Sequence, residues 1–97
     1  MKDLSIKGQL LSSLIFKGQI TGDSYDANKL SENGIWLITD TTIKNANNIT
    51  WAFLISLKFD GNTTLQFLVQ TDAEVTIFKR KLSPSGYTSN SEWMKIG

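Results

Sequence analysis

The sequence predicts an all-β domain, built as a small antiparallel β-sandwich or meander with polar loops. Residues 51–59 alternate between a face of aromatic and branched side chains and a second face that includes Ser56 and Lys58, which is the period of a β-strand. The Asp60-Gly61 pair that follows is typical of a hairpin turn, because glycine accepts a positive φ. Helix signals are scarce.

The other extended segments follow in order, each bounded by polar turn residues. They cover residues 16–20, 34–39, 64–70, 75–80 and 91–96, with turns at 32–34, 71–74 and 83–86. Residues 24–32 are compatible with a short helical turn capped by Ser24 or Asp26. Residues 40–50 are polar and rich in Asn, and long loops of this kind often carry binding function.

A short phrase near the N-terminus occurs twice. Ile-Lys-Gly-Gln-Leu at residues 6–10 returns at residues 16–20 as Phe-Lys-Gly-Gln-Ile. Each copy has apolar ends and a glycine, which is typical of a short strand with a bend. Either the likeness is a coincidence in a low-complexity lead-in, or only the second copy opens the folded domain. We therefore divide the chain into a lead-in or neck, residues 1–15, and a β domain, residues 16–97.

The composition argues against several classes of function. The 97 residues fit one domain and include no Cys and no His, so thiolate chemistry and the commonest metal ligand are missing. A net charge of +1 provides no broad basic face for nucleic acid. No apolar run is long enough to span a bilayer, and the acidic start does not fit a signal peptide. We expect no nucleic-acid partner, no membrane insertion and synthesis in the cytoplasm.

The carboxylates form no catalytic or metal-binding pattern. Asp23, Asp26, Asp40 and Asp60 lack the dense spacing of a calcium loop. A pair of them could in principle serve glycoside hydrolysis, but a small sandwich rarely contains a deep cleft. We expect no metal, no cofactor and no enzymatic activity; a small glycosidase would release reducing sugar.

A series of short motifs runs in order from residue 16 to the C-terminal end. Asp-Ala-Asn-Lys-Leu at 26–30 and Gly-Ile-Trp-Leu-Ile at 34–38 follow the second copy of the phrase. Asn-Ala-Asn at 45–47, Gln66, Arg80 and the closing Ser-Glu-Trp-Met-Lys-Ile at 91–96 complete the series. This order resembles the pyocin-knob domains of phage tail fibres and pyocin fibres. Ala27, Trp36, Asn47 and Trp51 stand where that family usually has other residues, which weakens the transfer of any ligand site.

The resemblance implies a small β module of a virion tail, on a fibre tip or baseplate, which meets other tail or fibre subunits and is commonly a homotrimer. The family varies in receptor and does not name the ligand; our first hypothesis for the function is recognition of a host cell-surface saccharide, through weak contacts summed over the copies. The alternative is a purely structural module of the fibre or baseplate, without a receptor site.

Trp51 and the amide-rich loop before it are the first candidates for a ligand site. Sugar sites combine a flat aromatic face with amide partners, and Asn47 and Asn48 precede Trp51 closely. Tyr87, in a second polar segment, is a further candidate. For both aromatic residues the alternative is a structural role beside a solvated loop.

Arg80 is the remaining candidate, since Lys79-Arg80-Lys81 is the chain's basic cluster. The cluster either binds phosphate or forms a solvated strand edge that blocks unwanted pairing. Trp36 and Trp93 are interpreted as structural residues, because aromatic side chains dominate burial in small cores.

Overall fold

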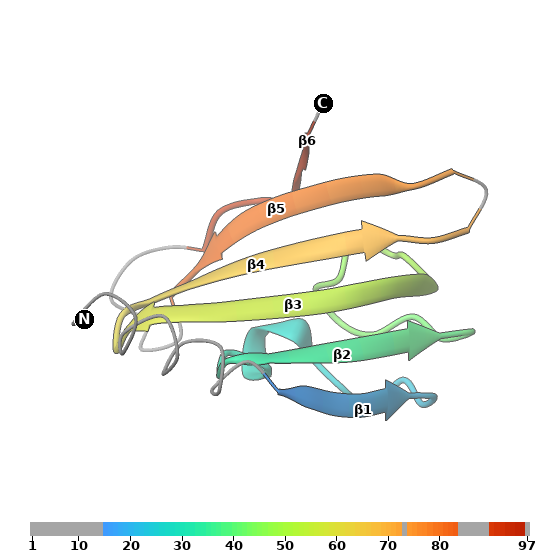
Figure 1. Cartoon of the computed structure of the whole chain (residues 1–97), viewed down its shortest axis with the longest axis horizontal. Helices are drawn as coiled ribbons and strands as arrows, with labels where there is room; N and C mark the ends of the chain where they lie inside the picture. Colours follow the sequence, from blue (N-terminus) through green and yellow to red (C-terminus); the bar gives the residue numbers. More distant parts are fainter. Residues whose placement is uncertain (1–14, 73, 84–89, 97) are drawn as a thin grey trace, which may run out of the picture.

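Six strands form one sheet whose spatial order follows the chain, β1-β2-β3-β4-β5-β6 (Figure 1). The computed structural model describes residues 15–72, 74–83 and 90–96. The strands are β1 (Phe16–Ile20), β2 (Gly34–Thr39), β3 (Trp51–Asp60), β4 (Thr63–Gln70), β5 (Thr76–Leu82) and β6 (Met94–Ile96). Neighbours from β2 to β6 are antiparallel. The predicted all-β class is confirmed, and the described residues take the meander form.

The edge strand β1 departs from the predicted antiparallel arrangement, because it pairs with β2 in parallel. Residues 21–33 return the chain to the end of the sheet where β1 began (Figure 1), so both strands run the same way. The register shifts between Phe16 and Gly18, and Gly18 has a φ of 123°, which other residues rarely adopt. The second copy of the repeated phrase is therefore a strand with a glycine at a bulge, as predicted. The first copy, residues 6–10, lies outside the described residues.

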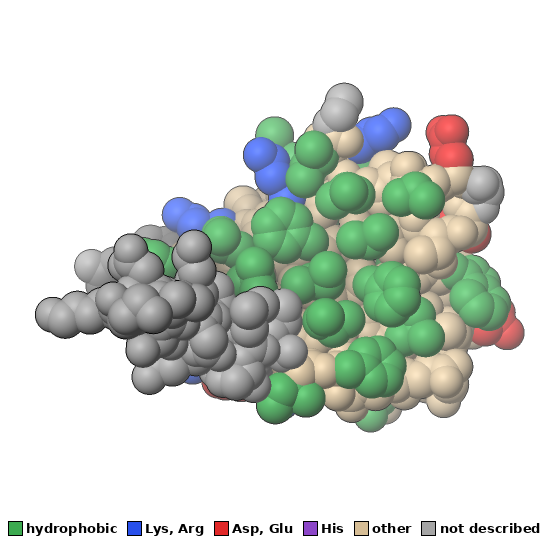
Figure 2. Space-filling model, viewed as in Figure 1, with side chains coloured by type: hydrophobic (Ala, Val, Ile, Leu, Met, Phe, Trp, Pro, Cys, Tyr) green, Lys and Arg blue, Asp and Glu red, His purple; other side chains and the backbone are tan. Residues whose placement is uncertain are grey.

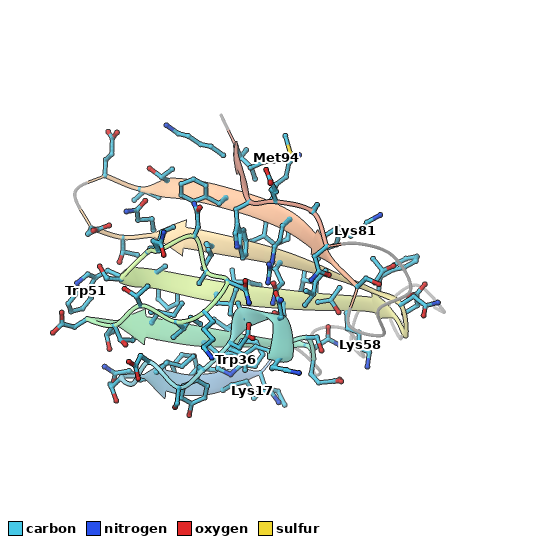
Figure 3. The ribbon with its side chains drawn as sticks, turned by 180° about the vertical axis from the view of Figure 1, so that it is seen from behind. Lys17, Trp36, Trp51, Lys58, Lys81 and Met94 are labelled. Carbon is cyan, nitrogen blue, oxygen red and sulfur yellow. The ribbon has the colours of Figure 1, made fainter. Side chains whose placement is uncertain are left out.

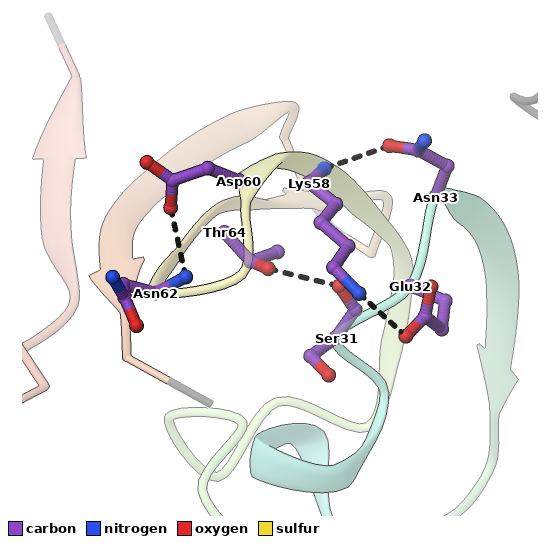
Figure 4. Close-up of polar contacts among 7 residues, drawn as sticks. All are labelled: Ser31, Glu32, Asn33, Lys58, Asp60, Asn62 and Thr64. Carbon is purple, nitrogen blue, oxygen red and sulfur yellow. Dashed lines mark hydrogen bonds and ion pairs between the residues drawn. The ribbon is translucent and has the colours of Figure 1, made fainter. Parts of the chain in front are cut away.

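The β3–β4 hairpin turns at the predicted Asp60-Gly61 pair. Asp60 Oδ1 accepts a hydrogen bond of 2.8 Å from the backbone N–H of Asn62 (Figure 4), and this local bond stabilises the turn. The pairing register shifts between Lys58 and Asp60, so the hairpin begins with a small irregularity rather than a uniform ladder.

The loop before β2 is fastened to this hairpin (Figure 4). Thr64 Oγ1 donates to the carbonyl of Ser31 at 2.9 Å, and the Lys58 backbone N–H donates to Asn33 Oδ1 at 2.7 Å. The Lys58 ammonium group also pairs with Glu32 at 3.0 Å. Thr64 is fully buried, so its bond to Ser31 matters more for stability than the solvent-exposed ion pair.

The inner face of the sheet is covered by the loops that flank β2. Alternate residues of the central strands point into this core, namely Trp36, Ile38, Ala52, Leu54 and Leu68. The loops add Ala27, Ile43, Ala46 and Ile49. The segment 40–50, predicted as a polar loop, therefore also supplies a layer of the core. Trp36 is 9% exposed, which agrees with its structural interpretation.

The covering loops are joined to each other by backbone hydrogen bonds. The Ala27 N–H donates to the Lys44 carbonyl at 2.9 Å, and the Lys44 N–H donates to the Tyr25 carbonyl at 3.1 Å. A short 3-10 turn, η1 (Ala27–Lys29), lies in the predicted helical segment, with Asp26 as its cap. The loops thus form one layer, and that layer positions the polar side chains described below.

The opposite face, here called the outer face, is not covered by any other described element. It is formed by Ile35, Leu37, Phe53, Ile55, Leu57, Leu65, Phe67, Val69, Ile77, Met94 and Ile96. Figure 2 looks onto this face and shows apolar side chains spread across the sheet. Phe53 is 38% exposed and Met94 is 61% exposed. The aromatic side of β3 is therefore the solvent side, and the side that carries Ser56 is the buried one.

Candidate functional site

Arg80 is the centre of a polar cluster under the loop layer. The interpretation of Lys79-Arg80-Lys81 as a solvated edge is wrong for Arg80, which is 8% exposed. Alternation along β5 turns Arg80 to the inner face and leaves both lysines exposed. Arg80 Nε donates to Gln66 Oε1 at 2.8 Å, and Nη2 donates to Asn28 Oδ1 at 2.7 Å.

Gln66 connects this arginine to the 3-10 turn. Its side-chain amide is fully buried, and Nε2 donates to the carbonyls of Ala27 and Leu30 at 2.9 and 3.2 Å. Ser56 Oγ lies 3.1 Å from the same nitrogen and donates to the Leu30 carbonyl at 2.6 Å. No buried side-chain nitrogen or oxygen in the described residues lacks a partner, so the cluster is a satisfied network that joins three strands to η1.

Trp93 lies over Arg80 and closes the cluster on one side. The guanidinium carbon is 4.5 Å from the centre of the indole ring, a cation–π contact. Trp93 Nε1 donates to the Asn45 carbonyl at 2.9 Å. Burial lowers the pKa of Arg80 to about 10, against the charge of Asp26, which raises it. The guanidinium is therefore charged at neutral pH, and the ring screens part of that charge from water.

A polar groove opens beside this cluster, between the loop layer and the segment before β6. It is lined by Asn28, Asn45, Asn47, Arg80, Asn90, Ser91, Glu92 and Trp93, and it has a volume of about 430 Å³. A neighbouring cleft of about 400 Å³, which includes Asp26 and Lys29, shares Asn28 and Asn90 with it. The two hollows therefore meet at shared amides.

The lining of the polar groove suits a polyhydroxylated ligand. An asparagine amide carries both donors and an acceptor, and Glu92 adds acceptor oxygens. Within the fold, Asn28 and Asn90 each use their oxygen and Asn45 uses its amide nitrogen, so their other amide atoms are the groups that a ligand can meet. The edge of Trp93 and the partly shielded Arg80 supply an apolar surface and a positive charge beside these amides. Among the described residues, no three His, Cys, Asp or Glu side chains cluster closely enough to hold a metal ion.

The structure brings together only some of the site residues that were predicted from the sequence. Asn47 and Arg80 line the same groove, whereas Asn48 is exposed in the same loop and does not line it. Trp51 is 42% exposed and lies on the outer side of β3, at the end of the sheet away from Lys58 and Lys81 (Figure 3). Tyr87 lies outside the described residues.

Sequence reasoning missed most of the groove's walls. Asn28, Asn90 and Glu92 come from segments far apart in the chain, and no local pattern joins them. Asn45 belongs to the Asn-rich loop at residues 40–50, so its amide could have been predicted from the sequence. Trp93 was interpreted as a core residue. It does pack against the core, and it also forms a wall of the groove.

The loops that shape the groove depend on Asp26. Its Oδ1 accepts hydrogen bonds from the Asn28 backbone N–H at 2.9 Å and from Asn45 Nδ2 at 2.8 Å. Burial raises the pKa of Asp26, but the hydrogen bonds from Asn45 and Asn28 outweigh it. The charges of Lys29 and Lys44 act in the same direction. The net pKa is therefore lower than the ordinary value of 3.8.

We expect Asp26→Ala to lower the free energy of unfolding by about 1 kcal/mol at pH 7, the usual effect of losing a cap. Because the pKa is lowered in the folded state, ionised Asp26 stabilises the fold above pH 3.8, and this contribution disappears as the pH falls through the folded-state value. Urea unfolding between pH 7 and pH 2 tests this. Asp26→Asn is the matched variant without a titrating group, and a wild-type curve that runs parallel to the curve of this variant at all pH values would contradict the linkage.

Comparison with known proteins adds no relative to this picture. No protein-family model matches the sequence, and neither the curated proteins nor the solved structures contain a match. In the described part of the chain, no helix has the length and apolarity needed to cross a membrane. The site is therefore interpreted from its own residues and geometry.

Proposed function

We propose that this chain is a knob-like module of a phage tail fibre or baseplate, and that it recognises a saccharide of the host cell surface in the polar groove. The observation that carries the saccharide part is the set of amides, Asn28, Asn45, Asn47 and Asn90, gathered beside Arg80 and Trp93. The virion setting, on the tail of a particle assembled in the host cytoplasm, rests on the motif order described above. The groove binds and does not hydrolyse, so no reducing sugar is released.

Arg80 and Glu92 give the groove a means of selection. A charged guanidinium at the base favours sugars with carboxylate or phosphate substituents, while Glu92 at the wall accepts hydrogen bonds from hydroxyl groups. An open, shallow groove of this size contacts only one or two sugar units. Binding per subunit is therefore weak, and attachment to a cell depends on several copies acting together.

The test compares two asparagines of one loop. Asn47 and Asn48 both have a positive φ, 58° and 57°, so replacement by Gly removes the side chain of either without backbone strain. Only Asn47 lines the groove. With the chain displayed multivalently on beads and screened against a glycan array, Asn47→Gly should weaken binding to the recognised glycan about tenfold per site, the effect of one hydrogen bond of ~1.4 kcal/mol.

Asn48→Gly is the matched control and should leave binding unchanged. Trp51→Ala separates the groove from the site first expected at the start of β3. Loss of glycan binding in Trp51→Ala, with Asn47→Gly unaffected, would move the site out of the groove. Binding to no glycan at high valency would leave the second candidate, a structural fibre or baseplate module, which the uncovered outer face favours.

A further inference from the structure

The outer face is continuous across the sheet. Strand register aligns its side chains into a row that crosses from β2 to β6 through Leu37, Phe53, Val69, Ile77 and Ile96. A second row begins with Ile35, Ile55 and Phe67 and reaches Met94 by way of Lys79. Adjacent side chains in such rows touch, so the face is one apolar patch and not a scatter of single residues.

The size of this patch is that of a stable protein interface. With fully exposed side chains of about 150–250 Å² each, the exposed fractions of the face, such as 38% for Phe53, 41% for Leu65 and 43% for Ile96, leave roughly 700 Å² of apolar surface open. Soluble monomers rarely expose patches above about 300–600 Å². A stable association buries about 600–1,000 Å² on each partner, so the face is large enough for one.

The charges around the face are arranged asymmetrically along the strands. Lys79 and Lys81 are exposed on β5 and lie toward its C-terminal end, while Asp72 and Glu74 are exposed before β5 begins. Figure 2 shows the acidic side chains at one end of the patch and basic side chains toward the other, with a further basic side chain near the acidic end. In the described residues, none of these four side chains forms an ion pair, since the ion pair found there joins Lys58 to Glu32.

We propose that the outer face packs against the outer face of a second copy of this chain, about a twofold axis that lies in the interface perpendicular to the strands. This axis reverses the strand direction between the copies. It places Lys79 and Lys81 of one copy over Asp72 and Glu74 of the other, twice in the pair. An arrangement with the strands running the same way, as around a threefold axis parallel to them, would instead gather the basic ends of all copies at one end of the assembly and the acidic ends at the other.

The pair is a two-sheet sandwich with the apolar rows as its core, packed at the usual separation of about 10 Å. The polar groove lies on the inner side of each sheet, with Arg80, so it stays open in the pair and faces away from the interface. The charge arrangement therefore selects a twofold pair as the multivalent unit, in place of the trimer that the family resemblance implied.

Sedimentation equilibrium of the full chain over a dilution series tests the pairing. The wild-type protein should be a dimer, and Phe53→Glu should weaken association at least 100-fold by placing a carboxylate in the centre of an apolar row. Tyr25→Glu is the control, because Tyr25 is 44% exposed but lies in the loop layer; this variant should remain dimeric. A wild-type monomer at all concentrations, a trimer, or a dimer indifferent to Phe53→Glu would each overturn the proposal.

A charge exchange tests the twofold arrangement and leaves every apolar side chain of the two rows in place. Lys79→Glu with Lys81→Glu should weaken the dimer about tenfold, and Asp72→Lys with Glu74→Lys should do the same. All four substitutions in one chain should restore wild-type affinity, because the reversed charges again meet their opposites. If the separate pairs have no effect, or if the combined variant stays weak, the copies are not related by this axis.

Discussion

Gln66→Leu is expected to lower the free energy of unfolding by about 3 kcal/mol, with each buried group that loses its partner contributing about 1–3 kcal/mol. Leu has nearly the volume of Gln and fits the strand, so packing alone predicts little change. The loss comes from the hydrogen bonds of the amide. The Ala27 carbonyl loses its donor at 2.9 Å, and Arg80 Nε loses its acceptor at 2.8 Å, while the guanidinium stays charged and largely buried.

Gln70→Leu is the matched control, since Gln70 lies on the same face of β4 and is only partly buried. Its replacement should change the free energy of unfolding by less than about 0.5 kcal/mol, as is usual away from such networks. Urea unfolding at pH 7 measures both variants, and equal m-values would show that the denatured states are comparable. Equal losses in the two variants would mean that the polar network contributes no more than any glutamine on this strand.

This network also marks the limit of what the sequence predicts about the fold. Alternation in β3 identifies two faces correctly, but it does not say which one is buried. The aromatic side, with Phe53, looks like a core face, and yet Ser56 and Leu54 are the buried residues. Ser56 is acceptable there because the Leu30 carbonyl accepts a hydrogen bond from its hydroxyl group. That partner comes from a loop distant in the chain, and no local pattern reveals it.

The parallel pairing of β1 also depends on contacts between segments that are distant in the chain. The pattern of apolar and polar residues predicts a strand at residues 16–20. The direction in which this strand pairs depends on the path of residues 21–33 over the sheet. That path is set by tertiary contacts, such as the backbone bonds that join Ala27 to Lys44. A short turn was predicted in this segment and η1 is present, so the local element could be predicted and its position in the fold could not.

The candidate site follows the same division. The Asn-rich loop is recognisable from composition, and Asn47 does line the groove. Trp51 was linked to that loop by closeness in sequence, but β3 begins at Trp51, and strand alternation turns its side chain to the outer side. Trp93, distant in sequence, reaches the loop through its hydrogen bond to the Asn45 carbonyl. The aromatic partner of the amides is therefore set by topology.

Trp93→Ala is expected to lower the free energy of unfolding by about 3 kcal/mol, the lower end of the range for truncating a large packed aromatic residue. The indole packs against the core, lies 4.5 Å from the Arg80 guanidinium carbon and donates to the Asn45 carbonyl. Asn90 and Ser91 are held to β5 by hydrogen bonds with Ser83 and Lys81, but they precede Trp93, and β6 beyond it contains only Met94–Ile96. The variant should therefore also expose the backbone amides of β6 to faster hydrogen exchange.

Trp93→Phe distinguishes the contribution of the aromatic ring to stability from the contribution of the indole N–H group. This variant keeps an aromatic face over Arg80 and removes the donor to Asn45, so its loss should be about 1 kcal/mol, the value of one hydrogen bond. If Trp93→Phe is as destabilising as Trp93→Ala, the bond to the Asn-rich loop is the main contribution of the indole, and the loop's position depends on it. If Trp93→Phe is neutral, the ring holds the groove wall by packing and cation–π contact alone. In either case, a loss in Trp93→Ala of less than half the expected value, with β6 still protected from exchange, would show that strand pairing and not this tryptophan anchors the end of the chain.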